Sequence, residues 1–187
     1  MQNYAPGTVV PDNTTSEPMF SIFRTMIKAA DGLTSSQICT ITGLEYSTLQ
    51  NWVKRGYVSH PIKKKYYEGQ VARILIISAL RDCLKMDEII TLLHSVNGCL
   101  TDTGDDIIPD ADLYDYLCRI IKSMDDFGVS SERVNAAVSS VTADYTGPTP
   151  DSKHTLTVAL NVMVYAYVSG KLKNEAAMYY AQIKEVK

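Results

Sequence analysis

The stretch TSSQICTITGLEYSTLQNWVKRGYVSHPIKKKYY, residues 34–67, decides how the amino-terminal half of this chain is expected to fold. Thr34 followed three residues later by Gln37 is a capping-box pattern, which marks the first turn of a helix. Gly43 then supplies a residue that can end the helix in the left-handed conformation. The pattern predicts a short helix of about two turns between these points.

The residues after the turn GLEY predict a second short helix. Its apolar residues recur at helical spacing and would form one buried side: Leu49, Trp52 and Val53. We expect Trp52 to anchor the core rather than to stack on a ligand, since large apolar side chains of such helices are usually buried. Gly56 suits the left-handed residue that ends the helix. Two short helices across a glycine-containing turn are typical of a helix-turn-helix.

The flanks of this motif predict the parts that surround it. Residues 57–67, YVSHPIKKKYY, favour a small β hairpin, which we call the wing. Helical periodicity follows over residues 68–84 and 87–96. An amphipathic helix over residues 18–30 precedes the motif and would pack beneath it. The expected module is a winged helix-turn-helix domain over residues 18–98.

The remaining residues divide into an arm and a carboxy-terminal helical region. Residues 1–17 are rich in Pro, Thr, Asn and Gly and lack periodicity, so we expect a flexible arm. A loop near residue 98 predicts a boundary, after which residues 99–187 would form a dimerisation or effector domain. Apolar periodicity there predicts helices from Asp110 through Phe127, from Ser130 or Ser131 to Val141, from Ser152 to Ser169, and from Lys171 to about Glu185. The fold class is therefore mainly α, with a carboxy-terminal α-helical bundle after the wing.

The last two of these predicted helices point to an interface. Residues 152–169 are apolar on nearly every side, and a helix of that kind must be covered all round. The inner face of the final helix is expected to consist of Leu172, Ala176, Tyr179 and Ile183. Tyrosines are well suited to a dimer interface, because they bury area and keep a polar tip: Tyr165, Tyr167, Tyr179 and Tyr180. The same tyrosines could instead line a ligand pocket.

The formal net charge of −3 hides an uneven distribution. Between Tyr46 and Arg81, seven basic residues are opposed only by Glu68, which leaves a net charge of +6. From Asn97 onward, eight bases meet thirteen acids, which leaves −5. A compact basic face is the electrostatic footprint of phosphate binding. The helix-turn-helix segment is therefore the part expected to contact double-stranded DNA.

The second helix offers side chains that suit base recognition. Its polar residues avoid the buried side and are free to face outward: Ser47, Gln50, Asn51 and Lys54. Amide side chains can pair bidentately with adenine in the major groove. Basic residues would hold the DNA backbone, namely Lys54 and Arg55 on the helix and Lys63, Lys64 and Lys65 in the wing.

A family resemblance becomes visible at this point. Residues 47–61, S-T-L-Q-N-W-V-K-R-G-Y-V-x-x-P, resemble the MerR-type signature, and the likeness continues through K-K-Y, Q-V-A-R-I and L-K-M-D-E-I across residues 34–96. The resemblance implies dimers that bind DNA through the second helix and the wing. Carried over by position, it implies DNA-facing or helix-orienting roles for Thr48, Gln50, Asn51, Trp52, Lys54, Lys64, Lys65 and Tyr66. The whole chain also resembles an uncharacterised bacterial family known only as a domain of unknown function.

Three departures from the MerR pattern limit what can be carried over. Gln50 and Asn51 stand where the family usually has Arg-Tyr, which favours base reading over phosphate contact at that point. The wing is shorter than usual. The long coiled-coil helix that follows the module in that family is replaced by residues 113–186, so effector binding is not carried over.

Other chemistries lack support in the sequence. The chain contains no P-loop, G-x-G-x-x-G, G-x-S-x-G or H-E-x-x-H motif, so we expect no enzyme and no cofactor. His94 and His154 have no Cys or His at ligand spacing, so we expect no metal site. The cysteines form no C-x-x-C pair, and their apolar neighbours favour buried structural thiols: Cys39, Cys83, Cys99 and Cys118.

The sequence also predicts where the protein acts. The first 20 residues lack the order of a signal peptide, and the most apolar stretch is shorter than the roughly 20 residues of a membrane helix. We expect a cytoplasmic, homodimeric, sequence-specific transcriptional regulator whose carboxy-terminal helices could sense an unidentified small-molecule effector. The alternatives are an excisionase-like architectural DNA-binding protein, and a scaffold whose basic face meets an acidic protein.

Overall fold

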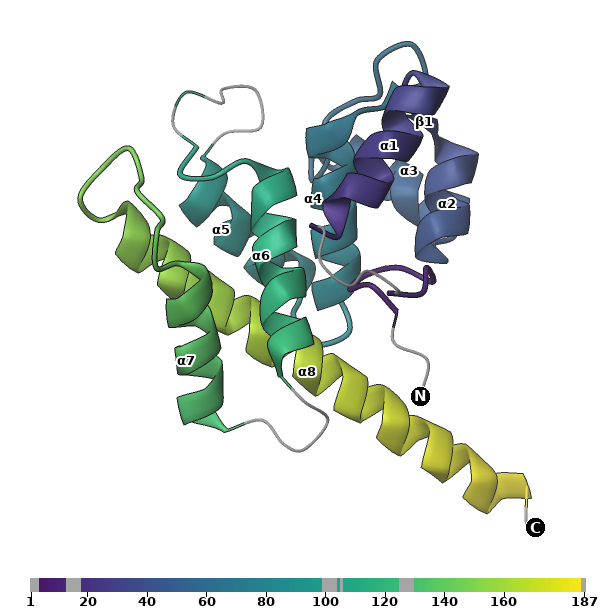
Figure 1. Cartoon of the computed structure of the whole chain (residues 1–187). Helices are drawn as coiled ribbons and strands as arrows, with labels where there is room; N and C mark the ends of the chain where they lie inside the picture. Colours follow the sequence, from purple (N-terminus) through teal and green to yellow (C-terminus); the bar gives the residue numbers. More distant parts are fainter. Residues whose placement is uncertain (1–3, 13–17, 99–103, 105, 125–129, 186–187) are drawn as a thin grey trace.

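The computed structural model describes residues 4–12, 18–98, 104, 106–124 and 130–185. The chain is mainly helical, as predicted, and has one small two-stranded sheet (Figure 1). Its elements are α1 (Phe20–Ala30), β1 (Leu33–Thr34), α2 (Ser35–Thr42), α3 (Tyr46–Lys54), β2 (Lys65–Tyr66), α4 (Glu68–Leu80), α5 (Met86–Asn97), α6 (Asp110–Ser123), α7 (Ser131–Val141) and α8 (Ser152–Glu185). Within the described residues, no helix is both long and apolar enough to span a membrane.

The two short helices α2 and α3 form as their local signals predicted. The Thr34 hydroxyl accepts the Gln37 backbone N–H at 3.4 Å, and the Gln37 side chain accepts the Thr34 backbone N–H at 2.9 Å. Gly43 ends α2 with a φ of 69°, and Gly56 follows α3 with a φ of 74°. The predicted inner side of α3 is buried: Leu49, Trp52 and Val53.

The wing differs from the predicted hairpin. Its strand β2 pairs antiparallel with β1, which precedes α2, with Leu33 opposite Tyr66. Inside the wing, only a tight turn from Ile62 to Lys65 is closed by backbone hydrogen bonds, each 2.9 Å long. The pairing with β1 is favoured because it brings together two side chains that are almost completely removed from water, those of Leu33 and Tyr66.

Residues 4–12 do not behave as the expected flexible arm. The Tyr114 hydroxyl donates a 2.8 Å hydrogen bond to the Pro6 carbonyl. Gly7 has a φ of +72° and approaches α4 so closely that a Cβ at this position would lie 2.1 Å from a backbone carbonyl oxygen. A glycine is required for this approach. The other residues of the predicted arm lie outside the described residues.

Helix α4 forms the centre of the core and contacts both halves of the chain. Every residue from Val71 to Ile77 is buried, and α4 packs against α1, α2, α5, α6 and α8. One hydrophobic cluster contains residues from before and after the predicted boundary near residue 98. The two predicted domains therefore share one core.

Two predicted helix ends lie at other positions in the structure. Helix α4 ends at Leu80, four residues before the predicted end, and the following residues form a turn in which the Cys83 N–H donates a 3.1 Å hydrogen bond to the Leu80 carbonyl. Helix α6 ends at Ser123, and Phe127, which was expected to continue its apolar stripe, lies outside the described residues.

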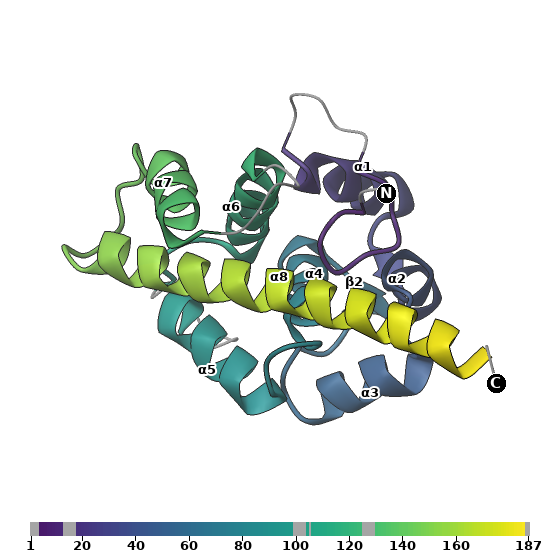
Figure 2. The ribbon, with the colours of Figure 1, turned by 90° about the horizontal axis from the view of Figure 1, so that it is seen from below.

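The two predicted carboxy-terminal helices are one continuous helix. Helix α8 has 34 residues and crosses the whole molecule (Figure 2). Gly170 lies inside it, not between two helices, and is buried against the turn after α4, where a Cβ would lie 3.2 Å from Asp82 Cβ. The glycine thus allows α8 to approach this turn closely. The predicted inner face of the last helix was wrong, because its residues are exposed: Leu172, Ala176, Tyr179 and Ile183.

Candidate nucleic-acid interface

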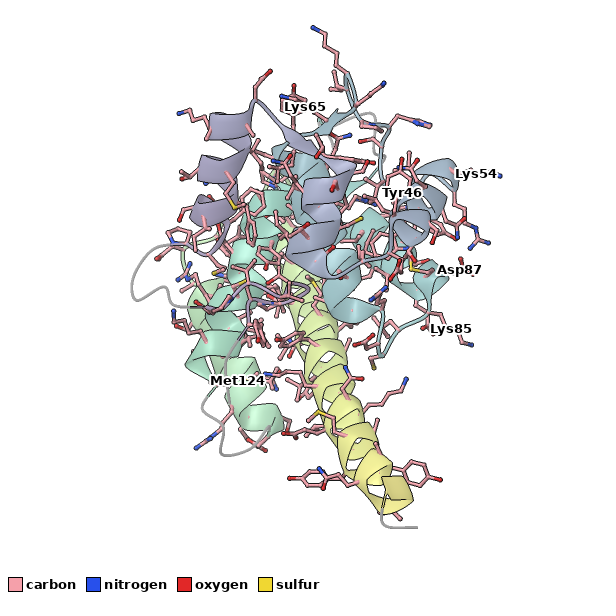
Figure 3. The ribbon with its side chains drawn as sticks, turned by 90° about the vertical axis from the view of Figure 1, so that its right-hand side faces the viewer. Tyr46, Lys54, Lys65, Lys85, Asp87 and Met124 are labelled. Atoms are coloured by element: carbon pink, nitrogen blue, oxygen red, sulfur yellow. The ribbon has the colours of Figure 1, made fainter. Side chains whose placement is uncertain are left out.

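Helix α3 presents a polar face opposite its buried side. Ser47, Asn51 and Lys54 are exposed and follow one another at intervals of four and three residues, so they share one face of the helix. Thr48 and Gln50 are half-buried beside this face. Figure 3 shows Lys54 at the outer edge of α3. The residues predicted to read bases therefore lie on the surface and on one short helix.

The tip of the wing carries two lysines in an unusual backbone conformation. Lys63 and Lys64 have φ angles of 49° and 65°, and both side chains are exposed. Positive φ at both central residues defines a type I′ turn, for which Asn-Gly is strongly preferred. A residue with a Cβ costs about 1–2 kcal/mol in this left-handed conformation. Backbone strain of this kind clusters at functional sites.

Lys65 and Tyr66 hold the wing in place. Tyr66 is fully buried, so its predicted contact with DNA was wrong: a side chain without exposed surface cannot reach a phosphate. The Lys65 ammonium donates a 2.5 Å hydrogen bond to the Ala30 carbonyl and lies 3.9 Å from an Asp31 carboxylate oxygen. A cation is favourable at the carboxy-terminal end of a helix such as α1. Lys65 therefore fastens β2 to α1.

One of the seven bases in the basic segment does not contribute to the surface. Arg73 is only 3% exposed, and burial lowers the pKa of its guanidinium while nearby Asp110 opposes that shift. The acid of the segment is also engaged, because Glu68 forms a 2.9 Å ion pair with Arg24. The exposed bases of the segment are Lys54, Arg55, Lys63, Lys64 and Arg81.

Arg73 belongs to a buried polar cluster that links α3 to the carboxy-terminal helices. Its Nε atom donates a 2.9 Å hydrogen bond to the carbonyl of Tyr57, just after α3, and its Nη1 atom lies 3.6 Å from Asp110 Oδ2 at the start of α6. Asn97, at the end of α5, donates a 2.6 Å hydrogen bond to the other Asp110 oxygen. Burial raises the pKa of the Asp110 carboxyl. The cluster fixes the end of α3 relative to α5 and α6.

The sequence prediction missed two exposed side chains on this side of the molecule. Tyr46 was placed in the turn, but it is the first residue of α3 and is 59% exposed. Lys85 precedes α5 and lies along the same side as Lys54 (Figure 3). It falls four residues after the segment whose charges were counted. In this view Asp87 lies between Lys54 and Lys85, so an acid separates the two cations.

The cysteines have three different environments. Cys118 is buried, as predicted, and Cys39 is half-buried. Cys83 is exposed, so its predicted burial was wrong, because α4 ends before it. Cys99 lies outside the described residues. Among the residues that the structure describes, no cluster of His, Cys, Asp or Glu side chains is grouped to hold a metal ion.

A shallow hollow of about 400 Å³ lies beside α6, away from α3. Its wall includes Asp115, whose carboxylate accepts the Phe20 N–H at 2.7 Å and so holds the start of α1. Burial raises the pKa of the Asp115 carboxyl. The role of Asp115 in capping α1 accounts for this buried acid.

Comparison with known proteins finds a family and a relative whose descriptions give no function. The chain is 28% identical over 91 residues to "Uncharacterized protein YkrK" of Bacillus subtilis (strain 168). The aligned region covers 46% of this chain and 39% of that relative. The chain thus matches about two fifths of the relative's length. No solved structure matches the chain significantly. Residues 26–117, which include α2, α3, the wing, α4 and α5, match the family described as "Domain of unknown function (DUF1836)".

Proposed function

We propose that this protein is a homodimeric, sequence-specific DNA-binding regulator of transcription, with α3 in the major groove and the wing on the phosphate backbone. The observation that carries this proposal is that exposed cations lie at the end of α3 and at the tip of the wing. In particular, Lys63 and Lys64 occupy strained positions at the wing tip, where uncharged residues would fit the backbone better. A role of the two positive charges in phosphate binding would account for lysines at these strained positions.

The exposed side chains of α3 provide the means of reading sequence. An α-helix fits the major groove, and each good bidentate pair between an amide side chain and adenine discriminates by about 1–3 kcal/mol. Asn51 is exposed on the outer face of α3 and Gln50 lies beside it. The exposed cations Lys54, Arg55, Lys63 and Lys64 would position the protein without reading sequence. The likeness of residues 34–96 to MerR-type proteins supports the same assignment.

The regulatory part of the proposal rests on the connection between α3 and the carboxy-terminal helices. The Arg73 cluster joins Tyr57, three residues after α3, to α5 and α6. A change in the packing of these helices, caused by an effector or by dimerisation in the cytoplasm, would therefore act on α3.

The proposal is tested by selecting binding sites for the full chain from random duplexes and measuring affinity across salt concentrations. We expect log affinity to fall linearly with log salt, with a slope of about −0.9 for each phosphate neutralised. Four exposed cations per protomer would give a slope near −3.6 for each half-site. Failure to bind any duplex at about 50 mM salt would refute the proposal.

Two variants separate base reading from phosphate contact. Asn51→Ala should relax preference at a base pair and leave the salt slope unchanged, because the residue carries no charge. Lys54→Ala, one helical turn along the same face, should weaken binding to all sequences and reduce the slope by about 0.9. An unchanged sequence preference in Asn51→Ala would contradict the role of Asn51 in reading bases.

A further inference from the structure

A stripe of outward-facing residues runs along α8 with a coiled-coil repeat. Its members are spaced alternately by four and three residues, and every one of them is exposed: Val158, Val162, Tyr165, Ser169, Leu172, Ala176, Tyr179 and Ile183. This spacing is the a/d pattern of a heptad repeat, in which a 3.5-residue period keeps one seam facing a partner helix. The opposite face of α8 packs into the core of the molecule through buried side chains: Leu156, Leu160, Met163 and Tyr167. The stripe is therefore separate from the residues that hold α8 in the fold.

Hydrogen bonds from Lys173 and Asn174 to Asp82 hold α8 just beyond its midpoint, and the side chains of residues 176–183 that follow are exposed. This last part of α8 extends away from the other helices toward the carboxy terminus (Figures 1 and 2). All side chains from residues 176 to 183 are exposed, and Leu172, Tyr179 and Ile183 are each at least 60% exposed. A helical segment of this length is marginal in water without tertiary packing. Large exposed apolar patches usually mark an interaction surface.

We infer that α8 pairs with α8 of a second copy in antiparallel orientation, about a two-fold axis that passes between Ser169 and Leu172. In this arrangement the projecting half of each helix covers the outward stripe of the other copy's anchored half. The two half-stripes, residues 158–169 and 172–183, have equal length. A single two-fold axis thus covers both half-stripes of both copies. An interface of this kind, in which the same surface of each copy is used, is closed and isologous. The inference deepens the proposed function by specifying its homodimer, but it does not depend on DNA binding.

The sizes of the stripe residues favour the antiparallel orientation. The axis places Tyr165 opposite the partner's Ala176, and Tyr179 opposite the partner's Val162. Ser169 likewise meets the partner's Leu172, so large side chains face smaller ones along the seam. A parallel pair would instead place each tyrosine opposite the same tyrosine of the partner, and Ala176 opposite the partner's Ala176. Alternating crowding and gaps of that kind are unfavourable in a packed interface.

The area of the stripe is sufficient for a specific dimer. A tyrosine can bury roughly 150–250 Å², and the six large apolar side chains of the stripe are between 39% and 67% exposed. Covering these side chains on both copies removes roughly 1,000 Å² of accessible surface from solvent, without counting the flanking residues. This area reaches the lower limit for a specific interface, about 1,000 Å².

The first test is the oligomeric state of the full chain, measured by sedimentation equilibrium in the absence of DNA. We expect a dimer, and we expect Leu172→Glu/Tyr179→Glu to be a monomer whose core still unfolds cooperatively, because both side chains are exposed. The helix signal of the projecting segment and the concentration dependence of the melting temperature should be lost with the dimer. Met178→Glu is the matched control: Met178 is 63% exposed on the same segment but lies off the stripe. A monomeric wild-type chain, or a dimer that survives the double substitution, would overturn the inference.

Disulfide cross-linking tests the orientation in a Cys39→Ser/Cys83→Ser/Cys99→Ser background. Mixing Tyr165→Cys with Ala176→Cys should give a cross-linked pair, whereas Ala176→Cys alone should stay uncross-linked. Efficient cross-linking of Ala176→Cys with itself would show a parallel pair and contradict the proposal. The two proposals fail separately, because a monomer that binds duplex DNA contradicts only the dimer, and a dimer that binds no duplex contradicts only the proposed function.

Discussion

Replacing Lys63 and Lys64 by Asn and Gly is expected to stabilise the protein and to weaken DNA binding at the same time. The exchange Lys63→Asn/Lys64→Gly introduces the residues that a type I′ turn prefers. It also removes two exposed charges from the wing tip. A merely structural wing would respond only in stability, so the two measurements together test the functional role of the lysines.

The expected magnitudes follow from the backbone angles and the charges. Lysines at φ angles of 49° and 65° carry a cost of about 1–2 kcal/mol each. Glycine has no such cost, but it loses roughly 0.5–1 kcal/mol through the greater freedom of the unfolded chain. The net stabilisation should be about 1–2 kcal/mol. If both lysines contact phosphates, the salt slope should fall by about 1.8 for each protomer.

The assay combines urea unfolding with fluorescence anisotropy on a labelled duplex at several salt concentrations. Arg133→Ala/Lys153→Ala is the control, because it removes the same charge from α7 and the start of α8, and both residues are exposed. We expect the control to leave the salt slope unchanged. The reasoning is refuted if the wing variant and the control have the same slope, or if the wing variant is less stable than the wild type.

Three further predictions concern buried groups. Asp110→Ala leaves the Arg73 guanidinium buried without its partner, so the free energy of unfolding, measured by urea unfolding, should fall by about 3–5 kcal/mol. A loss under about 1 kcal/mol would contradict this pairing. In a Cys39→Ser/Cys99→Ser background, a thiol reagent should label Cys83 rapidly and Cys118 only after unfolding, because burial raises the pKa of the Cys118 thiol and shields it. Rapid labelling after Cys83→Ser is added to this background would contradict the burial. Burial raises the pKa of Tyr167 from 10.0 to about 12, so its stabilising contribution is complete below pH 10 and is lost toward pH 12. Between pH 10 and pH 12, Tyr167→Phe should therefore lose less free energy of unfolding than the wild type. If the free energies of unfolding of the two proteins fall in parallel across this range, the prediction is wrong.

The features that the sequence predicted well are those decided by neighbouring residues. The capping box of Thr34 and Gln37 and the glycine at residue 43 each act within one turn of a helix, so they do not depend on distant contacts. The buried side of α3 likewise follows from its own periodicity.

The features that the sequence missed are decided by contacts between distant segments. The pairing of β2 with β1 joins residues 33 and 66, and no local pattern distinguishes it from a hairpin. Arg73 was counted as a surface cation, but it is buried and forms an ion pair with Asp110, which is distant in the sequence. Gly170 carries an ordinary helix-end signal, but its position against Asp82 gives it a packing role inside α8. Sequence reasoning assigned each residue its usual role, and tertiary packing changed it.

The proposed dimer and the proposed DNA interface together predict how the spacing of an operator affects binding. Helix α8 packs directly on α4 and α5, and the Arg73 cluster fixes the end of α3 relative to α5. The α8 dimer would therefore hold the two copies of α3 at one fixed separation and angle. Half-sites of such a dimer repeat with the DNA helical turn of about 10–10.5 base pairs.

Inserting about five base pairs between the half-sites turns one of them to the opposite side of the duplex, so the wild-type chain should lose the affinity gained from binding both. Leu172→Glu/Tyr179→Glu should bind each half-site weakly, and the insertion should not change its affinity. Gel-shift titrations on the two duplexes measure the difference. If the insertion has no effect on the wild type, the two copies of α3 are not held by a rigid dimer, even if each still binds DNA.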